Sequence, residues 1–240
     1  MRHKIALVAK RELASYFDSP VAYIVISAFL LVAGWMFFST LFLIGRADMR
    51  SFFAPSPFSP SMLLVVLVPA ITMKLVAEER RAGTFELLTT LPVRDSEIII
   101  GKFLAAWALV SIALATTLIY AFTVWSLGDL DWGPVIGGYL GLSLFSASLL
   151  AIGLLCSALT DKQVIAFIVS FLAGSALYFV YWLQFFVPQS LAGFLEYISL
   201  SYHLDNLARG VIDSRDVLFY VTLTAGTLVL TERAVARHHA

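Results

Sequence analysis

Few residues of this chain have the types and spacing that catalysis or nucleotide binding requires. A phosphate-binding loop needs a glycine-rich run that ends in Gly-Lys-Ser/Thr, but the Gly-Lys pair at Gly101 and Lys102 is followed by Phe103. A zinc protease needs two histidines four residues apart with a glutamate beside one of them. The four histidines lack such a partner: His3, His203, His238 and His239. The sequence therefore predicts no catalytic residue, no metal site and no cofactor bound by this chain.

The composition is typical of a protein embedded in a lipid bilayer. Hydrophobic residues make up 60% of the 240 residues and charged residues only 13%, whereas soluble domains carry about 25% charged residues. The formal net charge of zero gives no basic field for nucleic acid. A single cysteine, Cys156, excludes an internal disulfide. We therefore predict an integral membrane protein with the lipid bilayer as its surroundings.

Apolar runs divide the chain into six candidate membrane spans. A bilayer core of about 30 Å needs roughly 20 apolar residues in a helix. The runs are residues 21–44, 61–77, 103–127, 135–159, 164–187 and 217–231. The sixth run is short by this criterion, and Asp216 and Glu232 limit it. We expect one all-α transmembrane domain over residues 1–240, with both ends on the same side.

The six runs contain one ionisable residue, Lys74. Its long stem can reach the nearby membrane surface, so an interfacial lysine is the plainer interpretation. Ion-coupled transporters and intramembrane enzymes need ionisable groups at membrane depth. Both classes are therefore disfavoured, and any work must be driven from outside the membrane core.

The distribution of basic residues predicts the orientation. With the N-terminus inside, twelve of the 16 Lys and Arg residues fall in cytoplasmic segments and four in outer segments. Cytoplasmic loops carry the excess of positive charge. We therefore predict that both termini are cytoplasmic.

Three segments outside the spans have helical patterns. Residues 1–20 place apolar side chains on one face and Lys4, Arg11, Ser15 and Asp18 on the other, which is typical of a helix lying in the membrane interface. Residues 78–102 predict a cytoplasmic helix-turn-helix, in which Pro92 ends the first helix and Asp95 caps the second. Residues 189–199 are too apolar for a solvated loop and predict a short helix or re-entrant segment in the outer leaflet.

Two of these segments resemble a known family. The runs 78–93 (EERRAGTFELLTTLPV) and 97–103 (EIIIGKF) resemble the signature of type-2 ABC export permeases. The run 203–217 (HLDNLARGVIDSRDV) is similar to the gliding-motility-associated branch and to its relative in copper-enzyme maturation. The similarity extends from the first helix to the sixth span, essentially the whole chain, although the large extracytoplasmic domain of the wider class has no counterpart here.

The resemblance implies partners that the residues alone do not reveal. Two permease subunits, identical or paralogous, would pair in a bacterial inner membrane above two ABC ATPase subunits, which bind the ATP and Mg²⁺. A membrane-anchored extracytoplasmic accessory protein is a further candidate partner. The residues that the resemblance places at the ATPase contact are Glu78, Glu79, Gly83, Thr84, Glu86, Leu88 and Pro92, with Lys10, Arg11 and Glu12 of the first helix beside them.

Two functions remain open from the sequence. One is a non-enzymatic permease of an ATP-driven exporter, and the other is a membrane scaffold through which an ABC ATPase drives a mechanical or assembly task. The two differ in whether a transport path lies at the dimer interface. The substrate is open among lipid, peptide and polysaccharide. The five methionines do not cluster, so copper has no support as a cargo.

Overall fold

A computed structural model describes residues 2–45, 48–83, 94–186 and 188–237. These residues form helices and connecting turns without any strand. Six helical stretches in this part of the chain are long and apolar enough to cross a membrane. The predicted all-α class and the number of spans are therefore confirmed.

The described residues contain twelve α-helices. In chain order they are α1 (Arg2–Asp18), α2 (Pro20–Ile44), α3 (Arg50–Phe53), α4 (Pro60–Thr72), α5 (Ala77–Arg81), α7 (Asp95–Thr116), α8 (Leu118–Leu127), α9 (Trp132–Ala158), α10 (Gln163–Leu183), α11 (Gln189–Ile198), α12 (Leu200–Ala208) and α13 (Ser214–Arg237). A short 3₁₀ turn, Gln184–Phe186, follows α10.

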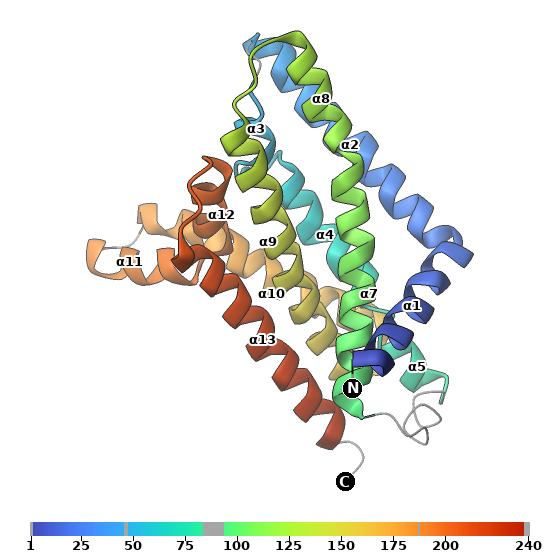
Figure 1. Cartoon of the computed structure of the whole chain (residues 1–240). Helices are drawn as coiled ribbons and strands as arrows, with labels where there is room; N and C mark the ends of the chain where they lie inside the picture. The colour runs from blue at the N-terminus through green and yellow to red at the C-terminus, as the bar shows by residue number, and fades with distance from the viewer. Residues whose placement is uncertain (1, 46–47, 84–93, 187, 238–240) are drawn as a thin grey trace.

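Helix α9 forms the centre of the bundle. It packs against α4, α7, α10, α12 and α13, and 72% of the residues in its most apolar stretch are buried. The corresponding share is 28% for α2, 22% for α10 and 17% for α13. Figure 1 shows α9 between α7 and α13, with α10 behind it. These three sparsely buried spans therefore offer their apolar faces to lipid or to another protein.

Glycines let α9 approach its neighbours closely. A Cβ atom at Gly138 would lie 2.2 Å from the ring of Phe53, and one at Gly137 would lie 2.4 Å from the carbonyl oxygen of Leu207. Side chains at these positions would push α3 and α12 away. The small residues of this span thus serve contacts within the chain.

The third span bends at Thr117, between α7 and α8. The Thr117 hydroxyl donates to the Leu114 carbonyl over 2.6 Å, and the Thr116 hydroxyl donates to the Ala113 carbonyl over 2.7 Å. Such bonds compete with the helical ladder and bend helices. The predicted span 103–127 is thus the later part of a longer, bent helical stretch that begins at Asp95.

The second span is interrupted, which differs from the continuous run predicted over 61–77. Helix α4 ends at Thr72, residues 73–76 form a turn, and α5 begins at Ala77. Pro69 lies inside α4 and has no N–H for the helical ladder. Apart from Lys74, the turn residues are as apolar as the helix around them, so the apolar pattern alone did not reveal the break.

The last span is longer than predicted. Helix α13 runs from Ser214 to Arg237 rather than over 217–231, so Asp216 lies in its first turn. Asp216 is only 3% exposed. Asp216 is buried against other helices of the same chain, which explains how it can lie within the last helix. Hydropathy alone had placed it outside the span.

One end of the bundle gathers several segments that are distant in sequence. Helix α1 lies alongside α7, and α5 lies below α1, near the first part of α7 (Figure 1). The last turns of α13 reach the same end (Figure 1). The short helix predicted over 189–199 is present as α11, at the far side of α12.

Candidate functional site

The first helix has the two faces that its sequence predicts. Lys4, Arg11, Ser15 and Asp18 are exposed, while the apolar residues from Ile5 to Phe17 on the predicted inner face are partly buried. Helix α1 crosses α7 where Gly101 leaves room for it, because a Cβ atom there would lie 2.6 Å from Val8 Cγ1. The glycine therefore fixes how closely the two helices cross.

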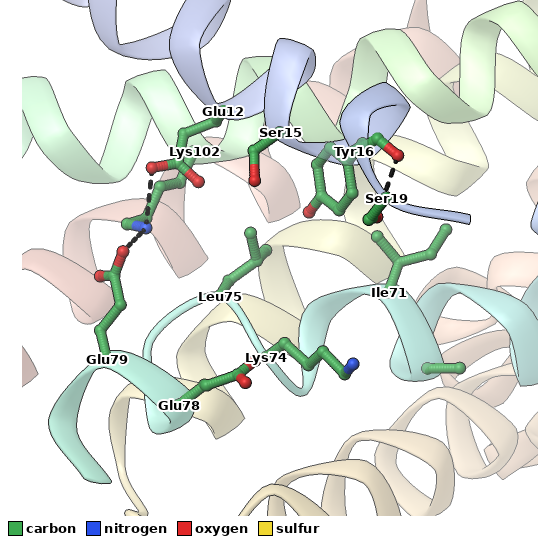
Figure 2. Close-up of a pocket in the computed structure, with 11 residues that line it drawn as sticks. Glu12, Ser15, Tyr16, Ser19, Ile71, Lys74, Leu75, Glu78, Glu79 and Lys102 are labelled. Carbon is green, nitrogen blue, oxygen red and sulfur yellow. Dashed lines mark hydrogen bonds and ion pairs between the residues drawn. The ribbon is translucent and has the colours of Figure 1, made fainter. Parts of the chain in front are cut away.

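The residue after this glycine joins three segments. Lys102 Nζ lies 2.6 Å from Glu79 Oε1 of α5 and 3.3 Å from Glu12 Oε1 of α1. Figure 2 shows the ammonium between the two carboxylates. The Lys102 side chain is 1% exposed, and the carboxylate side chains are 20% (Glu12) and 23% (Glu79) exposed. We call these three residues the Lys102 cluster.

The charge balance of the Lys102 cluster makes the lysine its indispensable member. Two carboxylates share one ammonium, so removing either carboxylate leaves a matched pair. Removing the ammonium leaves two partly buried carboxylates close together without the cation that they share, and removing one partner of a buried ion pair costs about 3–5 kcal/mol. The cluster therefore holds α1, α5 and α7 together as long as Lys102 is present.

A pocket of about 320 Å³ lies beside the Lys102 cluster, between α1 and the end of the second span. Ser15 and Tyr16 form one wall, and Ile71, Lys74 and Leu75 form the other (Figure 2). The space separates α1 from the interrupted part of the second span.

The Tyr16 hydroxyl has an unusual environment on this wall. It is buried, and no hydrogen-bond partner for it occurs among the described residues. Burial raises the pKa of Tyr16, and the nearby carboxylates of Glu12 and Glu79 raise it further. The phenol therefore stays neutral in any physiological condition and contributes packing rather than acid–base chemistry.

Helix α5 has a second ionic contact. Arg80 Nη1 lies 4.0 Å from Asp161 Oδ1, in the turn between α9 and α10. Asp161 is largely exposed, so this contact contributes little energy alone. Together with Glu79 it places neighbouring residues of α5 against two different parts of the bundle.

The structure brings together some of the predicted contact residues. Glu12 and Glu79 meet in the Lys102 cluster, whereas Lys10, Arg11 and Glu78 are exposed beside it. Gly83 follows α5 with a φ of +68°, a conformation that favours glycine. Four predicted contact residues lie outside the described residues: Thr84, Glu86, Leu88 and Pro92. The predicted first helix of the helix-turn-helix also lies outside them.

The prediction that Asp95 caps the second helix of this segment was wrong by one residue. Arg94 is the capping residue and Asp95 is the first residue of α7. The Arg94 backbone N–H donates to Glu97 Oε2 over 3.1 Å. Glu97 therefore closes the helix start from the first turn, where its charge also complements the helix dipole.

Sequence reasoning missed a buried ionisable pair at the opposite side of α13. His203 Nδ1 lies 2.6 Å from Asp216 Oδ1, and both side chains are 4% exposed. His203 Nε2 lies 3.1 Å from the Tyr197 carbonyl oxygen, which can only accept. Both ring nitrogens of His203 therefore have a hydrogen-bonding partner, one in α13 and one in α11. The thirteen-residue separation gave no helical spacing that could have revealed the pair.

The ion pairs among the described residues thus connect different helices. Residues 46–202 match the family described as ABC-2 family transporter protein. Two curated relatives, from Escherichia coli strain K12 and Escherichia coli O157:H7, each bear the name "Probable multidrug ABC transporter permease YbhR" and are 31% identical over 121 residues. The aligned stretch covers 50% of this chain and 32% of each relative, so the match spans about a third of the relatives' length.

Proposed function

The chain belongs to the ABC-2 family of transporter proteins, and from this premise we propose that it is the transmembrane permease subunit of an ATP-driven exporter. In this role it catalyses no reaction itself. Two separate ABC ATPase subunits bind ATP and Mg²⁺ and hydrolyse the nucleotide. Closure of these subunits moves the helices at one end of the permease, and the spans carry that motion through the membrane.

The observation that carries this proposal is the Lys102 cluster. A nearly fully buried lysine joins α1, α5 and the first turns of α7 within 3.3 Å. A push on the exposed residues of α1 or α5 therefore reaches the third span directly. Lys10, Arg11 and Glu78 supply exposed charges of both signs for contact with a soluble partner.

We assign the ATPase contact to this end, which places it and both termini in the cytoplasm of a bacterium with the protein in the inner membrane. The excess of basic residues in these segments supports the orientation. The set of contact residues includes Gly83, Thr84, Glu86, Leu88 and Pro92, which directly follow α5 in sequence.

A second permease copy or a paralogue would complete the complex. The sparsely buried spans α2, α10 and α13 leave apolar surface for this pairing, and a path along the two-fold axis is the simplest symmetric solution. The run 203–217 supports the gliding-motility-associated branch within the family. A membrane-anchored extracytoplasmic protein is the corresponding third partner.

The proposal is tested by crosslinking in the complete complex. A photoreactive amino acid is placed at Lys10 or at Glu78 in the permease co-expressed with its ATPase, and a matched control is placed at Asp213, which is also exposed. We expect crosslinks to the ATPase from Lys10 and Glu78 and none from Asp213.

A functional measurement accompanies the crosslinking. Glu86→Ala and Leu88→Ala should lower ATP hydrolysis by the reconstituted complex without changing the amount of permease in the membrane. Crosslinks from Asp213 instead of Lys10, or full hydrolysis in both variants with normal assembly, would contradict the proposal.

A further inference from the structure

The interruption of the second span is filled by a side chain from another helix. Ser157 of α9 is fully buried. Its Oγ accepts from the backbone N–H groups of Val76, over 3.2 Å, and of Ala77, over 3.1 Å. The same hydroxyl donates to the Met73 carbonyl oxygen over 3.3 Å. One hydroxyl therefore forms hydrogen bonds with three backbone groups at the turn.

The three groups are those that a continuous helix would use itself. In an uninterrupted α-helix the Ala77 N–H donates to the Met73 carbonyl, four residues earlier. Here the Ser157 hydroxyl stands between that donor and that acceptor. Insertion of a side chain into the helical ladder is a recognised cause of sharp helix kinks.

The surface of α9 around Ser157 is shaped for this contact. Gly153 lies one turn earlier on the same side of α9, and a Cβ atom there would lie 2.1 Å from Thr72 Oγ1. The end of α4 therefore rests on the glycine, and the beginning of α5 is held by the serine. Since unpaired backbone groups are costly within a membrane, the turn depends on α9 for its hydrogen bonds.

We propose that Ser157 is a positioning residue, which holds the second span in its interrupted form and so sets the direction of α5. Without the hydroxyl, the freed N–H and carbonyl groups can pair with each other and close α4 and α5 into one helix. Closure redirects α5, which carries Glu79 and Arg80. Movement of α9 relative to the second span thereby controls the segment beside the Lys102 cluster.

This inference depends on the proposed function only for the effect of α5 on coupling to the ATPase. The position of α5 itself can be measured without any transport. The interrupted form gains about one to two net hydrogen bonds from Ser157, so Ser157→Ala should shift the balance between the two forms by a factor of about 5 to 30. The direction of the shift is toward the continuous helix.

The test measures a distance in the full complex in lipid nanodiscs. Spin labels are attached to cysteines at Arg81 and Ile136, which are both exposed, in a Cys156→Ala background without nucleotide. In Ser157→Ala we expect a second distance population displaced by about 5 Å, on the order of one helical turn. The matched control is Ser146→Ala, because Ser146 is also buried in α9 but its hydroxyl donates to the Ser143 carbonyl of the same helix.

A second variant supports the assignment and covers a failure of Ser157→Ala to fold. Proline suits the first position of a helix, whereas inside a continuous helix it clashes with the carbonyl four residues earlier. Ala77→Pro should therefore return the Ser157→Ala distance to that of the parent. Where Ser157→Ala does not assemble, Ala77→Pro alone should abolish the change in distance that an ATP analogue causes in the parent.

The outcomes separate the inference from the function. An unchanged distance in Ser157→Ala, an equal shift in Ser146→Ala, or an equal nucleotide response in the parent and in Ala77→Pro would overturn it. A shift in distance without a change in ATP hydrolysis would leave Ser157 as a positioning residue and would instead remove the proposed role of α5 in coupling.

Discussion

Lys102 Nζ lies 2.6 Å from Glu79 Oε1, although Lys102 lies in the second turn of α7 and Glu79 lies in α5. The ammonium also reaches Glu12 of α1. This arrangement makes the shared lysine more important to stability than Glu12, one of its two carboxylate partners, and the difference can be measured.

Replacing Lys102 by methionine should destabilise the protein by about 3–5 kcal/mol, because two partly buried carboxylates are left without their cation. Glu12→Gln should cost about 1 kcal/mol or less, because Lys102 retains Glu79. The measurement is the thermal unfolding midpoint of the purified protein in detergent. Equal losses in the two variants would contradict the assigned charge balance.

Replacing Tyr16 by phenylalanine should leave stability unchanged or raise it by about 1 kcal/mol, since the hydroxyl is buried without a described partner. The variant should also respond less to alkaline pH. Because the pKa of Tyr16 is raised above its ordinary value of 10.0, the folded state keeps a proton that the unfolded state loses above pH 10. Stability of the parent therefore falls as the pH rises past 10, and Tyr16→Phe removes this contribution. A steeper alkaline loss in the variant would refute the interpretation.

Replacing either His203 or Asp216 should lower the free energy of unfolding. His203→Leu or Asp216→Leu each leaves an uncompensated polar group in a site that is 4% exposed, at a cost of about 3–5 kcal/mol. The double variant should cost less than the sum of the two, with a coupling of about 1–3 kcal/mol. Arg50→Gln is the control, because its pair with Asp131 is largely exposed and should be worth about 1 kcal/mol or less. Additive losses at His203 and Asp216 would show that they do not act as a pair.

Adding a methyl group at two glycines should have opposite effects. Gly138→Ala forces Cβ to within 2.2 Å of the Phe53 ring, and overpacking costs about 1–3 kcal/mol. Gly226 lies inside α13 with open space around its Cα, so Gly226→Ala should stabilise the helix by about 0.5–1 kcal/mol. Unfolding midpoints that move in the same direction would contradict the packing described for α9.

The orientation can be checked with a membrane-impermeant thiol reagent in a Cys156→Ala background. A cysteine at Lys10 should react only after the cells are opened, and a cysteine at Asp213 should react in intact cells. Both positions are exposed, so accessibility to solvent is matched. The reverse pattern would place α1 and α5 on the outer side and would exclude their contact with a cytoplasmic ATPase.

The sequence predicted the elements whose signal is local. Apolar length located the six candidate spans, and the period of α1 predicted which side chains face inward. The break after Thr72 could not be predicted, because it depends on a hydroxyl that lies more than eighty residues away in Ser157. The His203–Asp216 pair was not predicted, for a related reason. Both residues had been placed outside the apolar runs, and the burial of a charge is decided by neighbours that a single sequence does not reveal.

The candidate site was predicted in part. The run 97–103 drew attention to Gly101 and Lys102 as a motif, but their separate tasks, room for Val8 and a cation for two carboxylates, required the crossing of α1 over α7 to be known. Glu12 and Glu79 were placed near one another by resemblance, and their meeting on a single lysine follows from the fold.

The two ionic contacts of α5 have a mechanical consequence. Consecutive residues of a helix project about 100° apart around its axis, and Glu79 and Arg80 use that angle to contact α7 and the turn after α9. The Glu79 contact is short and mostly buried, whereas the Arg80 contact is 4.0 Å long and ends on an exposed carboxylate. Torque applied to this five-residue helix would thus release the exposed Asp161 side first and leave the lysine side as the pivot.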